Sequence, residues 1–121
     1  MSRQITIGYR DATGNDVPIE IRAPYFLFGC QQTSLNFWSN PYLKEIGINW
    51  LTILGESDPL YFSGWDDMAV LGREIELLSK HLARIESSPE IKACWLSHLT
   101  YCYHLLSEKA PRESMPQFTI G

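Results

Sequence analysis

The sequence predicts an α+β fold: an antiparallel sheet covered on one face by a C-terminal two-helix hairpin. Three observations predict it. Apolar and polar residues alternate in two N-terminal runs, apolar residues recur at three- and four-residue steps between residues 63 and 110, and turn-forming residues separate the segments. The chain has 121 residues, of which 45% are hydrophobic and 20% charged, and this size and composition are typical of one globular domain.

The first two strands are expected to form a hairpin. Apolar positions alternate with polar or small ones in two runs: Ile5, Ile7 and Tyr9, then Val17, Ile19 and Ile21. Residues 11–16 between them, Asp-Ala-Thr-Gly-Asn-Asp, are typical of a turn. Pro18 lacks a backbone N–H, so its strand is expected to lie at an edge of the sheet or to begin its pairing late.

The rest of residues 1–62 is expected to contain mainly strands and one short helix. The apolar run 25–28 fits either a third strand or a hydrophobic plug. Asn40 and Pro41 are typical of a helix cap and of a first helical position, and Gly47 of a helix end. These three residues predict a short helix near residues 41–46.

Three further segments complete the expected sheet. Residues 48–54 have the composition of a strand, and residues 60–62 are expected to form a short strand that leads into the helical hairpin. Residues 111–121 form an extended tail, in which alternating Phe118 and Ile120 suggest a last strand.

Two helices are expected over residues 63–110, and each begins with the spacing of a capping box, a serine followed three residues later by a carboxylate. The pairs are Ser63 with Asp66 and Ser87 with Glu90, and Pro89 suits the first turn of the second helix. Each helix has one apolar seam: Met68, Leu71, Ile75, Leu78, Leu82 and Ile85 in the first, and Ile91, Trp95, Leu99, Cys102 and Leu106 in the second.

Charge and cysteine content restrict the classes of partner. The net charge is −4 and the ten Lys and Arg residues are scattered, which argues against a nucleic-acid partner. The chain has neither an apolar N-terminal leader nor an 18-residue apolar run, so we expect a cytoplasmic protein with no membrane contact. The odd count of three cysteines is consistent with reduced thiols.

Cys94, His98 and Cys102 recur at four-residue steps on the second helix and are residue types that zinc prefers. Residues eight apart on a helix are separated by about 12 Å, so the three cannot share one ion. All three also fall within the apolar arc of the helix, and we expect them to pack in the core.

Two other groups of potentially reactive residues are expected to have structural rather than catalytic roles. Asp67, Glu74 and His81 follow one another at seven-residue steps and are expected to form a solvated flank, beside an ion pair of Glu76 with Lys80. Cys30 follows Gly29 in a predicted loop with no activating group nearby in the sequence. Because known catalytic motifs are also missing, the sequence favours a non-enzymatic protein without a metal or cofactor.

An acidic bias is the feature that points to a function. Six carboxylates lie between residues 56 and 76, against the single base Arg73. Glu56 and Asp58 precede the strand at 60–62, and Asp66 and Asp67 follow it in the first helical turn. These two groups are expected to form one acidic end of the molecule, able to attract a basic partner. The predicted partner-binding residues are Glu56, Asp58, Trp65, Asp66 and Asp67, with Trp65 as the contact anchor.

Residues 61–67, Tyr-Phe-Ser-Gly-Trp-Asp-Asp, resemble small immunity proteins of bacterial polymorphic-toxin systems, together with the helical positions Leu71, Glu74, Ile75 and Leu78. The resemblance implies an acidic cytosolic α+β protein that neutralises a toxin by binding it. The leading expectation is therefore a non-enzymatic protein-binding module, immunity-like or regulatory, that occludes a basic partner.

Two alternatives stay open. The first is a small-molecule-binding protein or small enzyme with a pocket between sheet and hairpin. Its expected lining is Tyr25, Phe28, Trp38 and Trp50, with His98 or Cys30 as the polar group. The second is a structural subunit that buries an apolar face of the hairpin in a homodimer.

Overall fold

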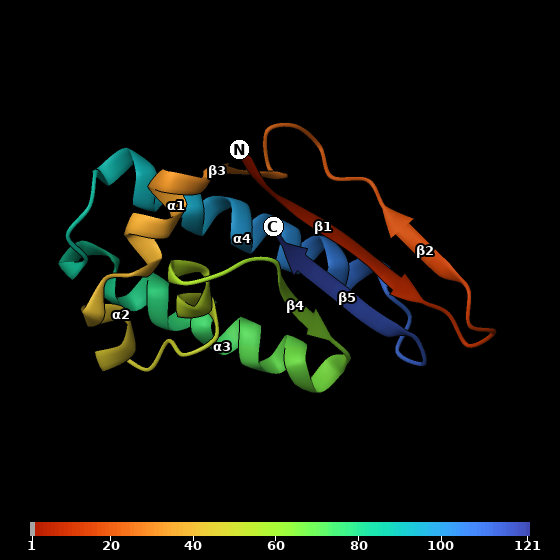
Figure 1. The fold of residues 1–121 in the computed structure, drawn as a ribbon. Helices are drawn as coiled ribbons and strands as arrows, with labels where there is room; N and C mark the ends of the chain where they lie inside the picture. Colours follow the sequence, from red (N-terminus) through yellow and green to blue (C-terminus); the bar gives the residue numbers. More distant parts are fainter. Residues whose placement is uncertain (1) are drawn as a thin grey trace.

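The computed structural model describes residues 2–121, except for the side chains of Ser2, Cys30 and Gln31. Five antiparallel strands form one open sheet (Figure 1): β1 (Ser2–Arg10), β2 (Asp16–Ile19), β3 (Leu27–Cys30), β4 (Leu60–Ser63) and β5 (Met115–Ile120). The strand order is β2-β1-β5-β4, and β3 pairs with the first residues of β1. The helices are α1 (Gln31–Trp38), α2 (Pro41–Glu45), α3 (Trp65–His81) and α4 (Pro89–Lys109), with 3₁₀ turns η1 (Leu51–Gly55) and η2 (Leu82–Arg84). The predicted α+β class is confirmed.

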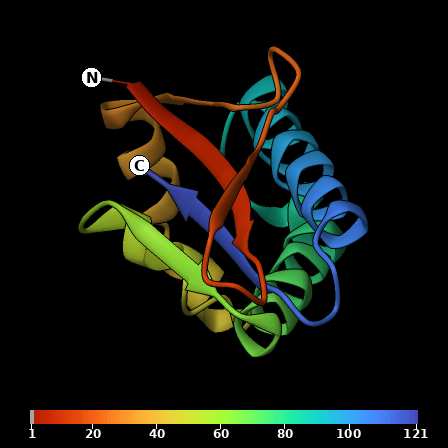
Figure 2. The same ribbon diagram turned by 90° about the vertical axis from the view of Figure 1, so that its right-hand side faces the viewer.

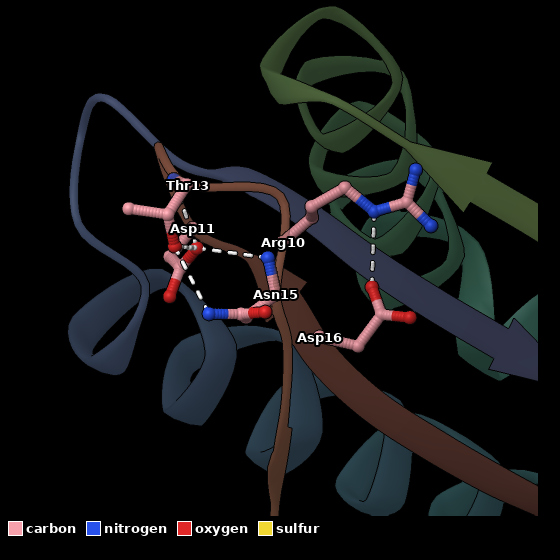
Figure 3. Close-up of polar contacts among 5 residues, drawn as sticks. All are labelled: Arg10, Asp11, Thr13, Asn15 and Asp16. Carbon is pink, nitrogen blue, oxygen red and sulfur yellow. Dashed lines mark hydrogen bonds and ion pairs between the residues drawn. The ribbon is translucent and has the colours of Figure 1, made fainter.

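The N-terminal hairpin is confirmed, with Ile7 opposite Ile19 and Gly8 opposite Pro18 on the edge strand β2. Its turn is held by the Asp11 carboxylate, which accepts hydrogen bonds from the backbone N–H of Thr13 at 3.0 Å and of Asn15 at 2.9 Å (Figure 3). The bond from the Thr13 hydroxyl and that from the Asn15 N–H lower the pKa of the Asp11 carboxyl.

The helices cover one face of the sheet and leave the other open (Figures 1 and 2). Along β1, Arg3, Ile5 and Ile7 are buried, whereas Gln4 and Thr6 between them are exposed. The core under the sheet contains most of both predicted helical seams: Met68, Leu71, Ile75, Leu78, Ile85, Trp95, Leu99, Cys102 and Leu106. The predicted seams therefore set how the hairpin packs.

The extended tail is a strand, as predicted, and it is central. β5 pairs with β1 through Ile7 opposite Phe118, and with β4 through Phe62 opposite the same Phe118. The Phe62 and Phe118 rings meet edge to face, with centroids 6.2 Å apart. Within the sheet, β5 thus lies between the predicted strand at residues 60–62 and the N-terminal β1–β2 hairpin.

Both predicted capping boxes are wrong by one position. The N-cap residues are Gly64, with φ of 88°, and Ser88, and neither makes a side-chain capping bond. At the start of α3 the carboxylate of Asp67, rather than Asp66, accepts a hydrogen bond from the Ser63 N–H at 2.9 Å. Pro89 does occupy the first turn of α4.

The middle of the chain departs most from the prediction. The expected short helix is confirmed as α2, where Asn40 Oδ1 accepts from the Tyr42 N–H at 3.1 Å. The strand expected over residues 48–54 is wrong, because this segment contains the 3₁₀ turn η1. Residues 31–38, where periodicity predicts no element, form α1, and the run 25–28 contributes its second half to β3. No helix in the described part of the chain is long and apolar enough to cross a membrane.

Candidate functional site

An apolar cavity of about 540 Å³ lies between β3 and the N-terminal half of α4. Its lining residues are Pro24, Leu27, Gly29, Thr33, Glu90, Ile91, Cys94, Trp95 and His98. The volume falls within the range of small-molecule sites, roughly 300–1,000 Å³, and an apolar lining with a few polar groups is typical of them.

The floor of the cavity is a cluster of aromatic side chains in the core. Trp95 is buried and packs against Phe28, with ring centroids 4.6 Å apart, and Phe28 stacks on Trp38 at 5.9 Å. Gly29 of β3 has a φ of 75°, and a Cβ at this position would overlap the Trp95 indole. A glycine is therefore required for β3 to lie directly against the helix.

Two polar groups of the cavity form an oriented pair. Cys94 Sγ lies 3.5 Å from His98 Nε2, and His98 Nδ1 lies 2.6 Å from the carbonyl oxygen of Leu27. Because a carbonyl can only accept, Nδ1 is a protonated ring nitrogen and donates to Leu27. Cys94 Sγ also lies 4.0 Å from Nδ1, which places the thiol over the face of the ring. A nucleophile, a base and a group that orients the base are thereby neighbours.

The four-residue spacing on α4 places the two side chains together, but their surroundings differ. His98 is buried, whereas Cys94 is exposed. The prediction that both cysteines of α4 pack in the core is therefore wrong for Cys94. Cys102 is fully buried, donates to the Tyr25 carbonyl at 3.3 Å, and burial raises the pKa of its thiol to about 12. Within the described residues, no group of three or more His, Cys, Asp or Glu side chains could hold a metal ion.

The predicted aromatic lining does not form this cavity. Phe28 and Trp38 are core residues beneath it. Tyr25 stacks on Tyr101 at 4.0 Å, and Trp50 packs on Phe62 at 5.1 Å. Of the two polar groups proposed with them, His98 lines the cavity, and the Cys30 side chain lies outside the described residues.

The predicted acidic surface is divided by β4. Glu56 and Asp58 precede Leu60, which pairs with Ile120, whereas Trp65, Asp66 and Asp67 follow Ser63, which pairs with Gln117. The two groups therefore lie at opposite ends of a four-residue strand, which spans about 10 Å. Asp58 is moreover paired with the buried Arg3, whose Nε lies 3.2 Å from the carboxylate.

The end of β4 that leads into α3 retains exposed aromatic groups. Tyr61 is 62% exposed and Trp65 is 37% exposed, next to the exposed Asp66. The Trp65 indole N–H is not free, since it donates to the carbonyl oxygens of Arg112 and Ser114 at 3.1 and 3.0 Å. This hydrogen bonding fixes the orientation of the ring at the surface.

Glu74 has a role that the sequence did not predict. It is buried, and its carboxylate accepts hydrogen bonds from the backbone N–H groups of Asn49 at 3.1 Å, Trp50 at 3.0 Å and Leu51 at 2.9 Å. The predicted solvated flank is thus wrong for this residue. His81, in the same row, contacts the Tyr42 hydroxyl at 3.5 Å, and the predicted pair of Glu76 with Lys80 is confirmed at 3.7 Å.

Comparison of this chain with protein-family models, curated proteins and solved structures found no match. The fold and site define an α+β domain with an open antiparallel sheet and an apolar cavity that carries a Cys–His pair. The function must therefore be inferred from the chemistry of the site.

Proposed function

We propose that the protein binds a small apolar molecule in the cavity between β3 and α4. The observation that carries this proposal is the presence of the Cys94–His98 pair in a mainly apolar wall, in which Thr33 and Glu90 are the other polar side chains. Apolar side chains supply affinity through burial, and a few fixed polar groups supply orientation.

The immediate surroundings support a cavity that keeps its shape. Trp95 is held between β3 and the aromatic core, and His98 is tied to the backbone of Leu27. In a preformed site, ordering of the side chains on ligand binding costs little free energy. The expected ligand has an apolar body and one polar or electrophilic group, which would meet Cys94 and His98.

Filling the cavity tests this proposal. Ile91→Trp places an indole in the wall, and Ser97→Trp adds the same group at an exposed position of α4 that does not line the cavity. We expect 1-nonanol, titrated by ligand-observed NMR, to bind the parent and Ser97→Trp equally and to bind Ile91→Trp at least about tenfold more weakly, a difference of about 1.4 kcal/mol. Equal binding by all three proteins would contradict the proposal.

A second candidate function is recognition of a protein partner with a basic surface, in an immunity-like or regulatory role. The observation that favours it is the end of β4 that leads into α3, where Tyr61, Trp65 and Asp66 are all exposed. Aromatic anchors beside a charged rim are typical of interfaces, and a carboxylate there steers a basic partner. The proposed surface also includes Glu56, Asp58 and Asp67, of which Asp58 and Asp67 have intramolecular partners as well.

Charge reversal tests the second candidate. Asp66→Lys changes an exposed carboxylate at this end, and Glu108→Lys makes the same change at an exposed position of α4. We expect a stoichiometric partner, captured from a lysate of the source cells and released by salt, to be retained by Glu108→Lys and lost by Asp66→Lys. Retention of that partner by both variants would exclude this surface.

A further inference from the structure

We propose that Cys94 is a nucleophile that adds to an apolar α,β-unsaturated carbonyl compound held in the cavity, with His98 as its base. The inference rests on the proposed ligand-binding function and names the class of ligand. It comes from the geometry of the Cys94 thiol, the His98 ring and the backbone of β3.

The base is fixed from a strand distant in the sequence. His98 Nδ1 donates to Leu27, which lies 71 residues earlier and belongs to β3, and β3 is itself paired with β1. The ring is 7% exposed, so it cannot turn away from the thiol without losing a buried hydrogen bond. Nε2 therefore stays beside Cys94 Sγ, which lies 3.5 Å from Nε2 and 4.0 Å from Nδ1, over the face of the ring. Proton transfer requires the exposed Cys94 side chain to rotate toward the Nε2 lone pair, after which the imidazole activates the thiol for attack.

The two described thiols of α4 differ in the way that this role requires. Cys94 is exposed at the cavity and has an imidazole 3.5 Å away. Cys102 lies two turns further along, is fully buried, and its nearest polar partner is the Tyr25 carbonyl, which cannot take a proton from it. Cys102 is thus an internal control in the same helix.

The walls and the dyad together define the ligand class. Pro24, Leu27, Ile91 and Trp95 suit an alkyl chain, and the dyad lies where the functional group of that chain would be held. Addition to a conjugated double bond needs no leaving group and no second reactant, so the dyad alone can complete it.

The step balances as follows. The S–H proton of Cys94 passes to His98 Nε2, and the sulfur electron pair forms a C–S bond to the β-carbon of the ligand. The π electrons of the C=C bond move to give an enolate, whose α-carbon takes the proton back from Nε2. The product is a thioether on Cys94 with the carbonyl group restored, and His98 returns to its neutral state.

The test follows adduct formation with trans-2-nonenal at neutral pH by intact-protein and peptide mass spectrometry. We expect an adduct on Cys94 in the parent, none at this position in Cys94→Ser, and rates lower by about tenfold or more in His98→Gln and in Ile91→Trp. Iodoacetamide, which is too small to need the cavity, should react more slowly with His98→Gln and at the parental rate with Ile91→Trp.

Two measurements keep the test valid if His98→Gln unfolds. Cys102 should stay unmodified in every folded variant and become reactive in urea. In the parent, native Cys94 should react with iodoacetamide about tenfold faster than the same thiol in the urea-unfolded chain at the same pH. If Cys94 reacts with iodoacetamide at equal rates in the native and the unfolded chain, the proposal that Cys94 is an activated nucleophile is wrong, whereas the proposed binding of 1-nonanol is not affected. Loss of 1-nonanol binding with a fast native thiol would overturn the proposed function and the ligand class instead.

Discussion

Among individual residues, Glu74 has the clearest structural role outside the cavity. Its carboxylate lies at the start of η1 and accepts three successive backbone N–H groups, which a strand could not direct at one point. Buried N–H groups must be satisfied, and a charged acceptor forms stronger hydrogen bonds than a neutral one. Glu74 thus accounts for the turn that replaces the expected strand.

We expect Glu74→Ala to lower the free energy of unfolding by about 3 kcal/mol, because it leaves one buried and two partly buried backbone donors without their acceptor. Glu74→Gln should lower it less, since the amide keeps one acceptor oxygen. Urea denaturation followed by circular dichroism measures both effects. Glu76→Ala, two residues along the same helix and exposed, serves as the control and should change stability by less than about 0.5 kcal/mol. A loss in Glu74→Ala no larger than in this control would disprove the role.

At the scale of elements, the ion pair of Arg3 with Asp58 connects β1 to the turn before β4. Arg3 is 1% exposed, and its Nη1 also donates to the Ser34 hydroxyl of α1 at 2.9 Å. One guanidinium therefore joins a strand, a helix and a turn. A buried charge that loses its partner is costly, so this connection is sensitive to single substitutions.

Two carboxylates of the predicted acidic surface, Asp58 and Asp66, are expected to differ in how much they contribute to stability. We expect Asp58→Ala to destabilise the protein by about 2–4 kcal/mol, because Arg3 would remain buried without its counter-charge. Asp66→Ala removes an exposed carboxylate and should shift stability by less than about 0.5 kcal/mol. Thermal and urea unfolding of the two variants side by side measure the difference. Similar stabilities would mean that Ser34 alone suffices for Arg3.

The short helix α2, which has a local sequence signal, was predictable, whereas η1, which depends on a distant side chain, was not. Asn40 and Pro41 predict α2, because capping is local. Residues 48–54 were wrongly predicted as a strand because their structure depends on a distant residue. Their strand-like composition is overridden by Glu74, which lies 23 residues from Leu51. The capping boxes failed by one position because a serine and a carboxylate three residues apart fit more than one start of the helix.

At the scale of the whole molecule, the fold class followed from periodicity, but the site did not. The seams of α3 and α4 indicate which faces are buried and thereby place the hairpin on the sheet. The cavity needs a further fact, the approach of β3 to α4, which brings the Leu27 carbonyl to His98 across 71 residues. The four-residue spacing of Cys94 and His98 was visible, yet nothing local showed that one would be exposed and the other oriented.

The central position of β5 has a consequence for how the protein is made. Among the five strands β5 is translated last, although it is the one that joins β1 to β4. While β5 is still inside the ribosome, β1 has an unpaired edge and β4 has no strand beside it. Such edges attract other chains and chaperones. The nascent chain must therefore keep a gap in its sheet open until its last strand is released to fill it.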